Sequence, residues 1–187
     1  MAYRLLYPIR TYLVVSGRYG EEVNVMAADW VMPVSAKPFM VAVAIAPTRY
    51  TYRLVEKYGE FVVSVPSVEN LRDVWIAGSE HGPGKLRRTS FDFAPASRVG
   101  TPVIRNALAN LECRVVDKHV YGDHVLYVGE VLAYHHREGA YVDFEPRLEA
   151  GFLAHIAMNK FTKFAREVVT VQWRCSMHEF TGGSLSN

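Results

Sequence analysis

The segment NVMAADWVMPVS, residues 24–35, carries the clearest signal in this chain of 187 residues. A run of small residues that ends in Asp29–Trp30 does not favour a helix, or a buried strand alone, and the apolar run 39–45 follows it. The small side chains of Ala27 and Ala28 allow the backbone to lie close against a flat molecule. Taken alone, the segment fits better a strand and polar turn whose Trp30 packs in the core.

A helix is expected to begin just after the apolar run 39–45. Thr48 is placed to cap it, the helix should run from Arg49 to Tyr58, and Gly59 should end it. The first N–H groups of a helix lack internal partners, and Arg49 can form a bidentate contact with a phosphate. A flat ring followed by a phosphate is the outline of FMN, although an ordinary capped helix with a solvent-facing Arg49 stays open.

The composition is that of a globular protein. Half of the residues are apolar, 21% are charged and the net charge is +2, so nothing indicates disorder or a nucleic-acid partner. We expect one cytoplasmic domain over residues 1–170 and a tail over residues 171–187, with no signal peptide and no membrane span. The two cysteines are too few and too far apart for a disulfide framework, and Cys113 should be core.

Strands dominate the expected secondary structure. The early ones are 12–16, 24–28, 39–45 and 61–65, and two further helices are expected at 69–77 and 102–109. Between Leu111 and Val115, apolar residues alternate with Glu112 and Arg114, which predicts one dry face and one wet face.

The run Val125–Ala133 is apolar on both faces, so both faces must be covered. It follows a turn at Tyr121–Asp123, and its Gly129 indicates curvature or a close backbone approach. The pattern predicts a mainly β protein, an antiparallel barrel with flanking helices.

Other motifs in the chain give weaker signals. The segment Gly78–Leu86 does not have the spacing of a P-loop, and no G-x-G-x-x-G follows a strand. The histidines near Asp117 and at His135–His136 offer no obvious third metal ligand, so we expect no metal.

The order of these segments resembles the flavin reductase-like, FMN-binding split-barrel family, which includes flavoredoxins, archaeal ferric reductases and reductase components of two-component monooxygenases. The resemblance covers roughly residues 8–165 and is carried by residues 24–35, 37–38, 48–51, 60–66, 111–115, 122–124 and 128–131. It implies an antiparallel Greek-key split barrel and a homodimer with FMN near the subunit interface.

The resemblance also implies a set of site residues. The flavin ring and ribityl chain would be lined by residues 26–31 and Ser35, while Arg49 and Thr51 would hold the phosphate. Two departures stand out: many members have Asn where this chain has Ser64, and the segment around Lys85 lacks their usual pattern. The implied cofactor-binding residues are Met26, Ala27, Ala28, Asp29, Trp30, Val31, Ser35, Arg49, Thr51, Ser64 and Lys85.

Two histidines are the catalytic candidates. The resemblance places His124 near the flavin and His155 on the nicotinamide side, where an imidazole can orient or protonate reduced flavin. A hydrogen-bonded histidine at a strand end is the structural alternative.

The expected function is that of an FMN-dependent oxidoreductase, with NADH or NADPH as a transient electron donor. Electrons would pass to free flavin, a ferric chelate or a partner protein. The alternative is a non-catalytic FMN-binding electron carrier, like a flavoredoxin, or a flavin sensor.

Overall fold

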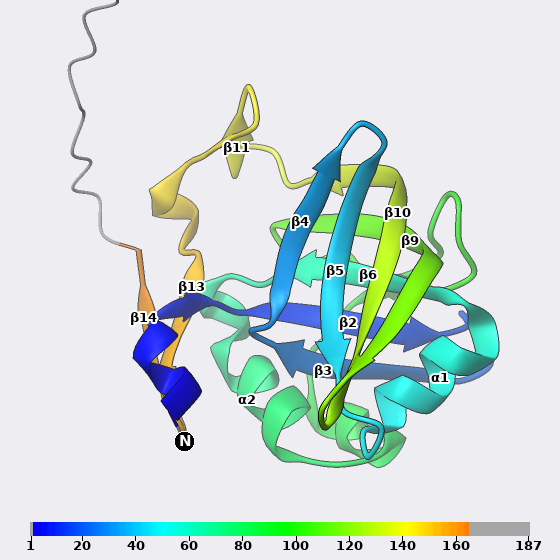
Figure 1. The fold of residues 1–187 in the computed structure, drawn as a ribbon. Coiled ribbons are helices and arrows are strands. Elements are labelled where there is room, and N and C mark those ends of the chain that lie inside the picture. The colour runs from blue at the N-terminus through cyan, green and yellow to red at the C-terminus, as the bar shows by residue number, and fades with distance from the viewer. Residues whose placement is uncertain (1, 165–187) are drawn as a thin grey trace, which may run out of the picture.

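The computed structural model describes residues 2–164, and the expected tail lies outside them. A seven-stranded, fully antiparallel sheet runs in the order β3-β2-β6-β9-β10-β5-β4 (Figure 1). Its strands are β2 (Tyr12–Gly17), β3 (Val23–Ala28), β4 (Val31–Ala36), β5 (Phe39–Ile45), β6 (Glu60–Val65), β9 (Ala109–Tyr121) and β10 (His124–His136). The predicted antiparallel, mainly β fold is confirmed.

The two edge strands, β3 and β4, follow each other along the chain, so the sheet curls back on itself. Residues 29 and 30 connect them, and the Trp30 carbonyl accepts a hydrogen bond from the Ala44 N–H at 3.1 Å. This connection, in the segment on which the sequence argument rests, closes one side of the split barrel.

Short elements surround the barrel. A three-stranded sheet of β1 (Ile9–Arg10), β13 (Leu153–Ala157) and β14 (Lys160–Lys163) lies beside the N-terminal turn η1 (Ala2–Leu6). The helices are α1 (Tyr50–Tyr58) and α2 (Leu71–Ser79), with 3-10 turns η2 (Val68–Asn70), η3 (Pro83–Arg88) and η4 (Leu148–Ala150). Two small hairpins pair β7 (Phe93–Ala94) with β8 (Val103–Ile104) and β11 (Tyr141–Val142) with β12 (Glu145–Pro146).

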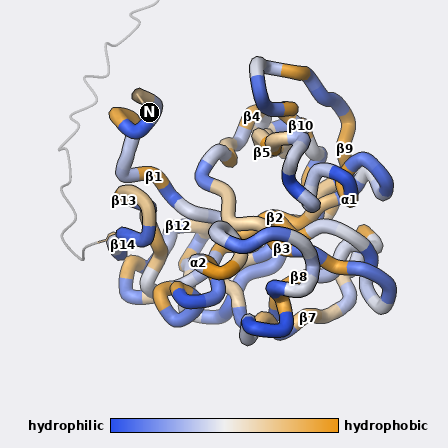
Figure 2. The backbone as a smooth tube through the Cα atoms, turned by 90° about the horizontal axis from the view of Figure 1, so that it is seen from below, coloured by the Kyte–Doolittle hydropathy of each residue, from blue (hydrophilic) through white to orange (hydrophobic). Residues whose placement is uncertain are grey.

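The barrel has an apolar core on each side of its central strands. Inside it, Val14, Phe61 and Tyr127 pack together with Cys113. On the outer side, alternate residues of β2 and β6 pack against α2 and the 91–107 segment. Figure 2 shows the mainly apolar colour of β2 at the centre of the molecule. Cys113 is fully buried, and burial raises the pKa of its thiol to about 12, as expected for a core cysteine.

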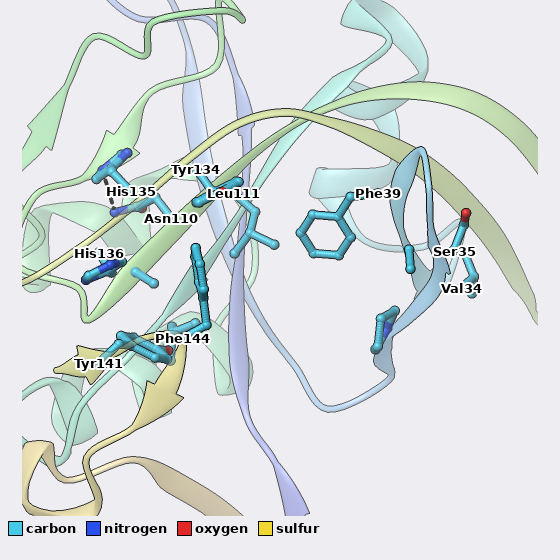
Figure 3. A pocket seen from close by; sticks show the side chains of 14 residues that line it. Val34, Ser35, Phe39, Asn110, Leu111, Tyr134, His135, His136, Tyr141 and Phe144 are labelled. Atoms are coloured by element: carbon cyan, nitrogen blue, oxygen red, sulfur yellow. Dashed lines mark hydrogen bonds between the residues drawn. The ribbon is translucent and has the colours of Figure 1, made fainter.

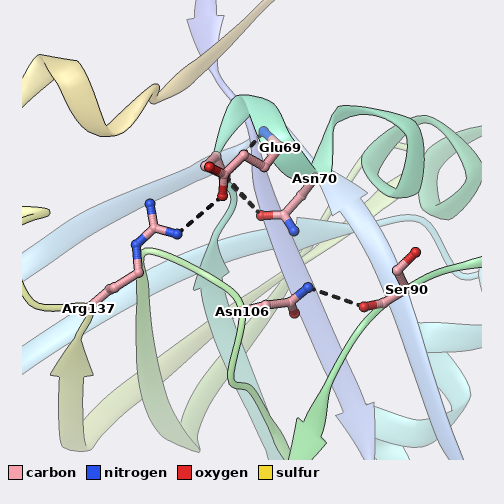
Figure 4. Close-up of polar contacts among 6 residues, drawn as sticks. Glu69, Asn70, Ser90, Asn106 and Arg137 are labelled. Atoms are coloured by element: carbon pink, nitrogen blue, oxygen red, sulfur yellow. Dashed lines mark hydrogen bonds and ion pairs between the residues drawn. The ribbon is translucent and has the colours of Figure 1, made fainter.

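The start of α2 is tied to the end of β10 (Figure 4). Ser67 and Asn70 form a capping box, and Glu69 pairs with Arg137 at 3.3 Å. Nearby, the Asn106 side chain donates to the Ser90 carbonyl at 3.1 Å. The capping box and the Glu69–Arg137 pair fix the segment that leads into α2.

Three local predictions were wrong. Residues 102–109 form β8 and a turn rather than a helix, because the Asn110 side chain bonds both the N–H and the carbonyl of Ile104, at 3.0 and 2.9 Å. Glu112 is only 1% exposed, since its carboxylate accepts bonds from the Ser97 and Arg98 N–H groups. The N-cap of α1 is Arg49 rather than Thr48, and it makes no side-chain cap.

The other main elements were predicted within a few residues. Gly59 ends α1 in the left-handed conformation, at φ 66°. Strand β10 turns Val125, Tyr127 and Gly129 inward and leaves Leu126 and Val128 half-buried on the outer face.

Candidate functional site

A narrow polar cavity lies where β3, the start of α1 and the segment after α2 meet. Strand alternation turns Asn24 and Met26 of β3 into it, and the turn before α1 brings Arg49. Across the cavity, η3 supplies Lys85. The full lining is Asn24, Met26, Arg49, Tyr50, Thr51, Glu80, His81, Gly82 and Lys85.

Lys85 is an unusual feature of this cavity because it is a buried cation. Its side chain is 6% exposed, and its Nζ donates to the carbonyls of Ala77 at 2.6 Å and Glu80 at 3.2 Å. Burial, and then the nearby Arg49, lower the pKa of Lys85 to about 8. Among the described residues, neither Lys85 nor Arg49 forms an ion pair with an acid. Glu80 also lines the cavity, but its carboxylate pairs with Arg88, so the cavity keeps a net positive charge.

Thr51 and Asn24 form the buried floor of the same cavity. The Asn24 Nδ2 donates to the Thr51 Oγ1 at 2.8 Å, and the Asn24 Oδ1 has no partner within the described part of the chain. Because the Thr51 hydroxyl accepts this bond, its own proton is available to donate into the cavity. Tyr50 and Thr51 are also the first residues of α1, whose N–H groups lack intrahelical partners. The cavity therefore has the donor set of an anion site.

The β3–β4 connection carries the next group of expected site residues. Ala28 is buried, and Ala27 lies under α2, where a Cβ added to Gly78 would come within 3.2 Å of the Ala27 Cβ. Trp30 is 38% exposed, and its ring lies 4.8 Å from that of His124, which also bonds Asp123 at 2.7 Å. The structure thus brings Trp30 and His124 together on one surface, with Val31 half-buried beside them.

Asp29 and His155 form a separate pair. The His155 Nδ1 lies 2.7 Å from the Asp29 carboxylate, and the His155 Nε2 lies 2.8 Å from the Met158 carbonyl. Both ring nitrogens of His155 are therefore engaged within the protein. The Asp29 carboxylate is likewise bonded by protein side chains.

Ser35 and Ser64 do not line the Arg49–Lys85 cavity. Ser35 lies at the far end of β4, in a large apolar cleft of about 960 Å³. Ser64 is fully buried and donates to the Asn110 Oδ1 at 2.6 Å, and the Asn110 side chain lines that same cleft.

The apolar cleft opens between the β4–β5 hairpin and the ends of β9 and β10. Figure 3 shows Val34, Ser35 and Phe39 on one side, facing Leu111, Tyr134, His135 and Phe144. Because the Asn110 Oδ1 accepts from the Ile104 N–H, its Nδ2 must donate to the His135 Nε2 at 3.1 Å. His135 is therefore an acceptor at Nε2. Sequence reasoning missed this cleft because its two walls come from segments about a hundred residues apart.

Sequence reasoning also missed Asn24, Tyr50 and His81 as lining residues, although Asn24 opens the segment quoted above. A polar residue two positions before Met26 in an alternating strand was the available signal. Within residues 2–164, no group of three or more His, Cys, Asp or Glu side chains is placed to hold a metal ion. No helix in that range has the length and apolar character needed to cross a membrane.

Comparison with known proteins gives a consistent picture. An uncharacterized protein of Pyrococcus abyssi is 55% identical over 166 residues, covering 89% of this chain and 96% of its own length. The NADH-dependent FMN reductase AsuE2 of Streptomyces nodosus subsp. asukaensis is 29% identical over 130 residues, covering 68% and 69%. The crystal structure of an FMN-binding protein from Thermus thermophilus with bound 1-cyclohex-2-enone superimposes with a TM-score of 0.80 at 27% identity, covering 88% and 91%.

The family model described as "Flavin reductase like domain" matches residues 3–151. That range includes the curled sheet, the β3–β4 connection and the cavity of Arg49 and Lys85. The chain belongs to the flavin reductase-like family.

Proposed function

We propose that this chain binds FMN, with the phosphate in the Arg49–Lys85 cavity and the ring toward the β3–β4 connection. The observation that carries the proposal is the buried Lys85 beside Arg49, two cations that form no ion pair with an acid in the described structure, the nearby Glu80 being paired with Arg88. A phosphate would balance both charges and accept bonds from Thr51 and from the first turn of α1. The FMN named in the T. thermophilus and S. nodosus relatives supports this choice of cofactor.

The activity we propose is that of an NAD(P)H-dependent flavin reductase, which passes electrons to flavin, a ferric chelate or a partner protein. Bound FMN would supply the hydride chemistry. The protein would hold the phosphate through Arg49 and Lys85 and present one face of the ring beside Trp30 and His124. The family and the NADH-dependent relative support an oxidoreductase of this kind.

A non-catalytic electron carrier is the second candidate, and one observation favours it. The ring nitrogens of His155 are both bonded within the protein, and His124 already bonds Asp123. His155 therefore has no free ring nitrogen for proton transfer and His124 has only Nε2, whereas a carrier needs no such group.

A homodimer is proposed with the same function. The apolar cleft and the outer face of β4 carry four exposed apolar residues, each between 44% and 70% exposed: Met32, Val34, Tyr134 and Phe144. A contiguous apolar surface of this kind marks an interface. We also propose that residues 1–170 form the FMN-binding domain and that the protein is cytoplasmic.

Two spectra test the function. The purified protein, or the protein mixed with FMN and desalted, should retain a flavin absorbance spectrum; a colourless product would overturn both candidates. Anaerobic addition of NADH or NADPH should then reduce the bound flavin, seen as rapid loss of its visible absorbance. Bleaching by dithionite but by neither nicotinamide would decide for the carrier.

The affinity for FMN should depend on pH through Lys85. Below pH 8 the ammonium of Lys85 is charged in the free protein and attracts the phosphate; above it the amine becomes neutral and the attraction is lost. Fluorescence titrations should therefore show affinity falling above pH 8, by at most about tenfold per pH unit for one linked proton. Lys85→Met should bind FMN more weakly and with a flatter profile. Parallel profiles in the two proteins would remove Lys85 from the phosphate site.

A further inference from the structure

The Asp29 carboxylate accepts hydrogen bonds from three side chains that lie far from it in sequence or on other elements. Tyr7 donates to Oδ2 and Thr11 to Oδ1, both at 2.8 Å, and the His155 Nδ1 lies 2.7 Å from Oδ2. The side chains of His155 and Asp29 are only 18% and 16% exposed. We call Tyr7, Thr11, Asp29 and His155 the Asp29 network.

The positions of the protons in this network follow from its donors and acceptors. An ionised carboxylate and a backbone carbonyl accept only, so His155 must donate from Nδ1 to Asp29 and from Nε2 to the Met158 carbonyl. Burial and the Asp29 carboxylate raise the pKa of Tyr7 well above its ordinary value, so Tyr7 keeps its proton and donates it. The hydrogen bonds are those of an imidazolium paired with a carboxylate.

Packing holds the imidazole ring in this position. Phe161 of β14 stacks on it with centroids 4.6 Å apart and planes at 19°, and Tyr7 meets it edge-on at 5.5 Å. The ring of His155 is thereby fixed between the N-terminal segment and the β13–β14 hairpin.

The network joins two sheets at the connection that presents Trp30. Asp29 follows β3 of the seven-stranded sheet, whereas His155 belongs to β13 of the three-stranded sheet. The adjacent Trp30 ring contacts Tyr3 of the N-terminal turn at 5.3 Å and His124 at 4.8 Å. Loss of the Asp29 charge would therefore loosen both the small sheet and the support of Trp30.

We propose that Asp29 is a positioning residue: its carboxylate holds His155 with both ring nitrogens protonated and so fixes the small sheet and Trp30 at the β3–β4 connection. If FMN binds as proposed, Asp29 acts on the ring side of the site through Trp30 and His155, without touching the cofactor. The contacts that carry this proposal exist without flavin, so it does not depend on the proposed function.

Nitrogen NMR of the histidine rings in the flavin-free, full-length protein tests the proposal. The variant is Asp29→Asn, and the matched control is Asp123→Asn, which removes the carboxylate of the exposed Asp123–His124 pair. We expect both ring nitrogens of His155, assigned with His155→Gln, to carry protons in the wild type and the control, and one nitrogen to lose its proton in Asp29→Asn. In Asp29→Asn the Trp30 indole signal should also shift, and the amides of β13 should exchange their hydrogens about tenfold faster, or more, than in the wild type.

Tyr7→Phe keeps the proposal testable if Asp29→Asn does not fold. It removes one donor and leaves the ion pair, so His155 should keep both protons while β13 exchanges moderately faster. A bare ring nitrogen on His155 in the wild type would overturn the proposal. So would unchanged exchange of β13 in Asp29→Asn. A failure of the proposed function is a separate result, seen as absence of FMN binding in the wild type.

Discussion

Replacing Arg49 with alanine should weaken FMN binding by about 10- to 150-fold. A hydrogen bond to a charged group contributes about 1.5–3 kcal/mol, and each 1.4 kcal/mol is a factor of about ten in affinity. In the proposed site Arg49 would share the phosphate charge with the buried Lys85, so its loss would leave one cation to balance a dianion. Titration of FMN fluorescence against the purified variant measures the change.

Two controls separate the phosphate contact from the fold. Arg53→Ala removes an exposed arginine from the same helix, outside the cavity lining, and should leave FMN affinity unchanged. Riboflavin lacks the phosphate and should bind the wild type and Arg49→Ala with similar affinity. An equal loss for riboflavin would show that Arg49 supports the fold, and an unchanged FMN affinity would remove Arg49 from the phosphate site.

Replacing Gly129 with alanine should destabilise the protein by about 1–3 kcal/mol. A Cβ at this position in β10 would lie 2.5 Å from the Phe61 Cζ and 3.0 Å from the Cys113 Cβ. Phe61 and Cys113 are fully buried in the barrel core, so neither can move aside without disturbing its neighbours. The midpoint of urea unfolding measures the loss.

Gly84→Ala is the matched control, because a Cβ there meets no atom within 4 Å. It should stay within about 0.5 kcal/mol of the wild type, as surface substitutions usually do. Trimming Phe61 to Leu in the Gly129→Ala background should restore part of the loss. A Gly129→Ala protein as stable as Gly84→Ala would show that the close approach of β10 to Phe61 is absent.

The sequence was sufficient for the elements whose pattern is local. Alternation and turn residues predicted β2, β3, β5 and β6, and Gly59 marked the end of α1. Prediction failed where a distant side chain replaces a local bond. Asn110 satisfies Ile104 across a turn, and the Ser97–Arg98 loop folds back over Glu112, so neither a helix at 102–109 nor a wet face at Glu112 formed.

The candidate site divides in the same way. Arg49, Thr51, Met26 and Lys85 were all expected from the sequence, and the structure brings them into one cavity. The pairing of Asp29 with His155 joins positions 126 residues apart and has no local signature.

A crystal structure of the protein with FMN should place the phosphate within hydrogen-bond distance of both Arg49 and Lys85, with the ring beside Trp30. That structure is the most direct test, because every part of the proposed function depends on where the phosphate lies. FMN seated instead in the apolar cleft of Ser35 and Phe144, with the Arg49–Lys85 cavity free of phosphate, would contradict it.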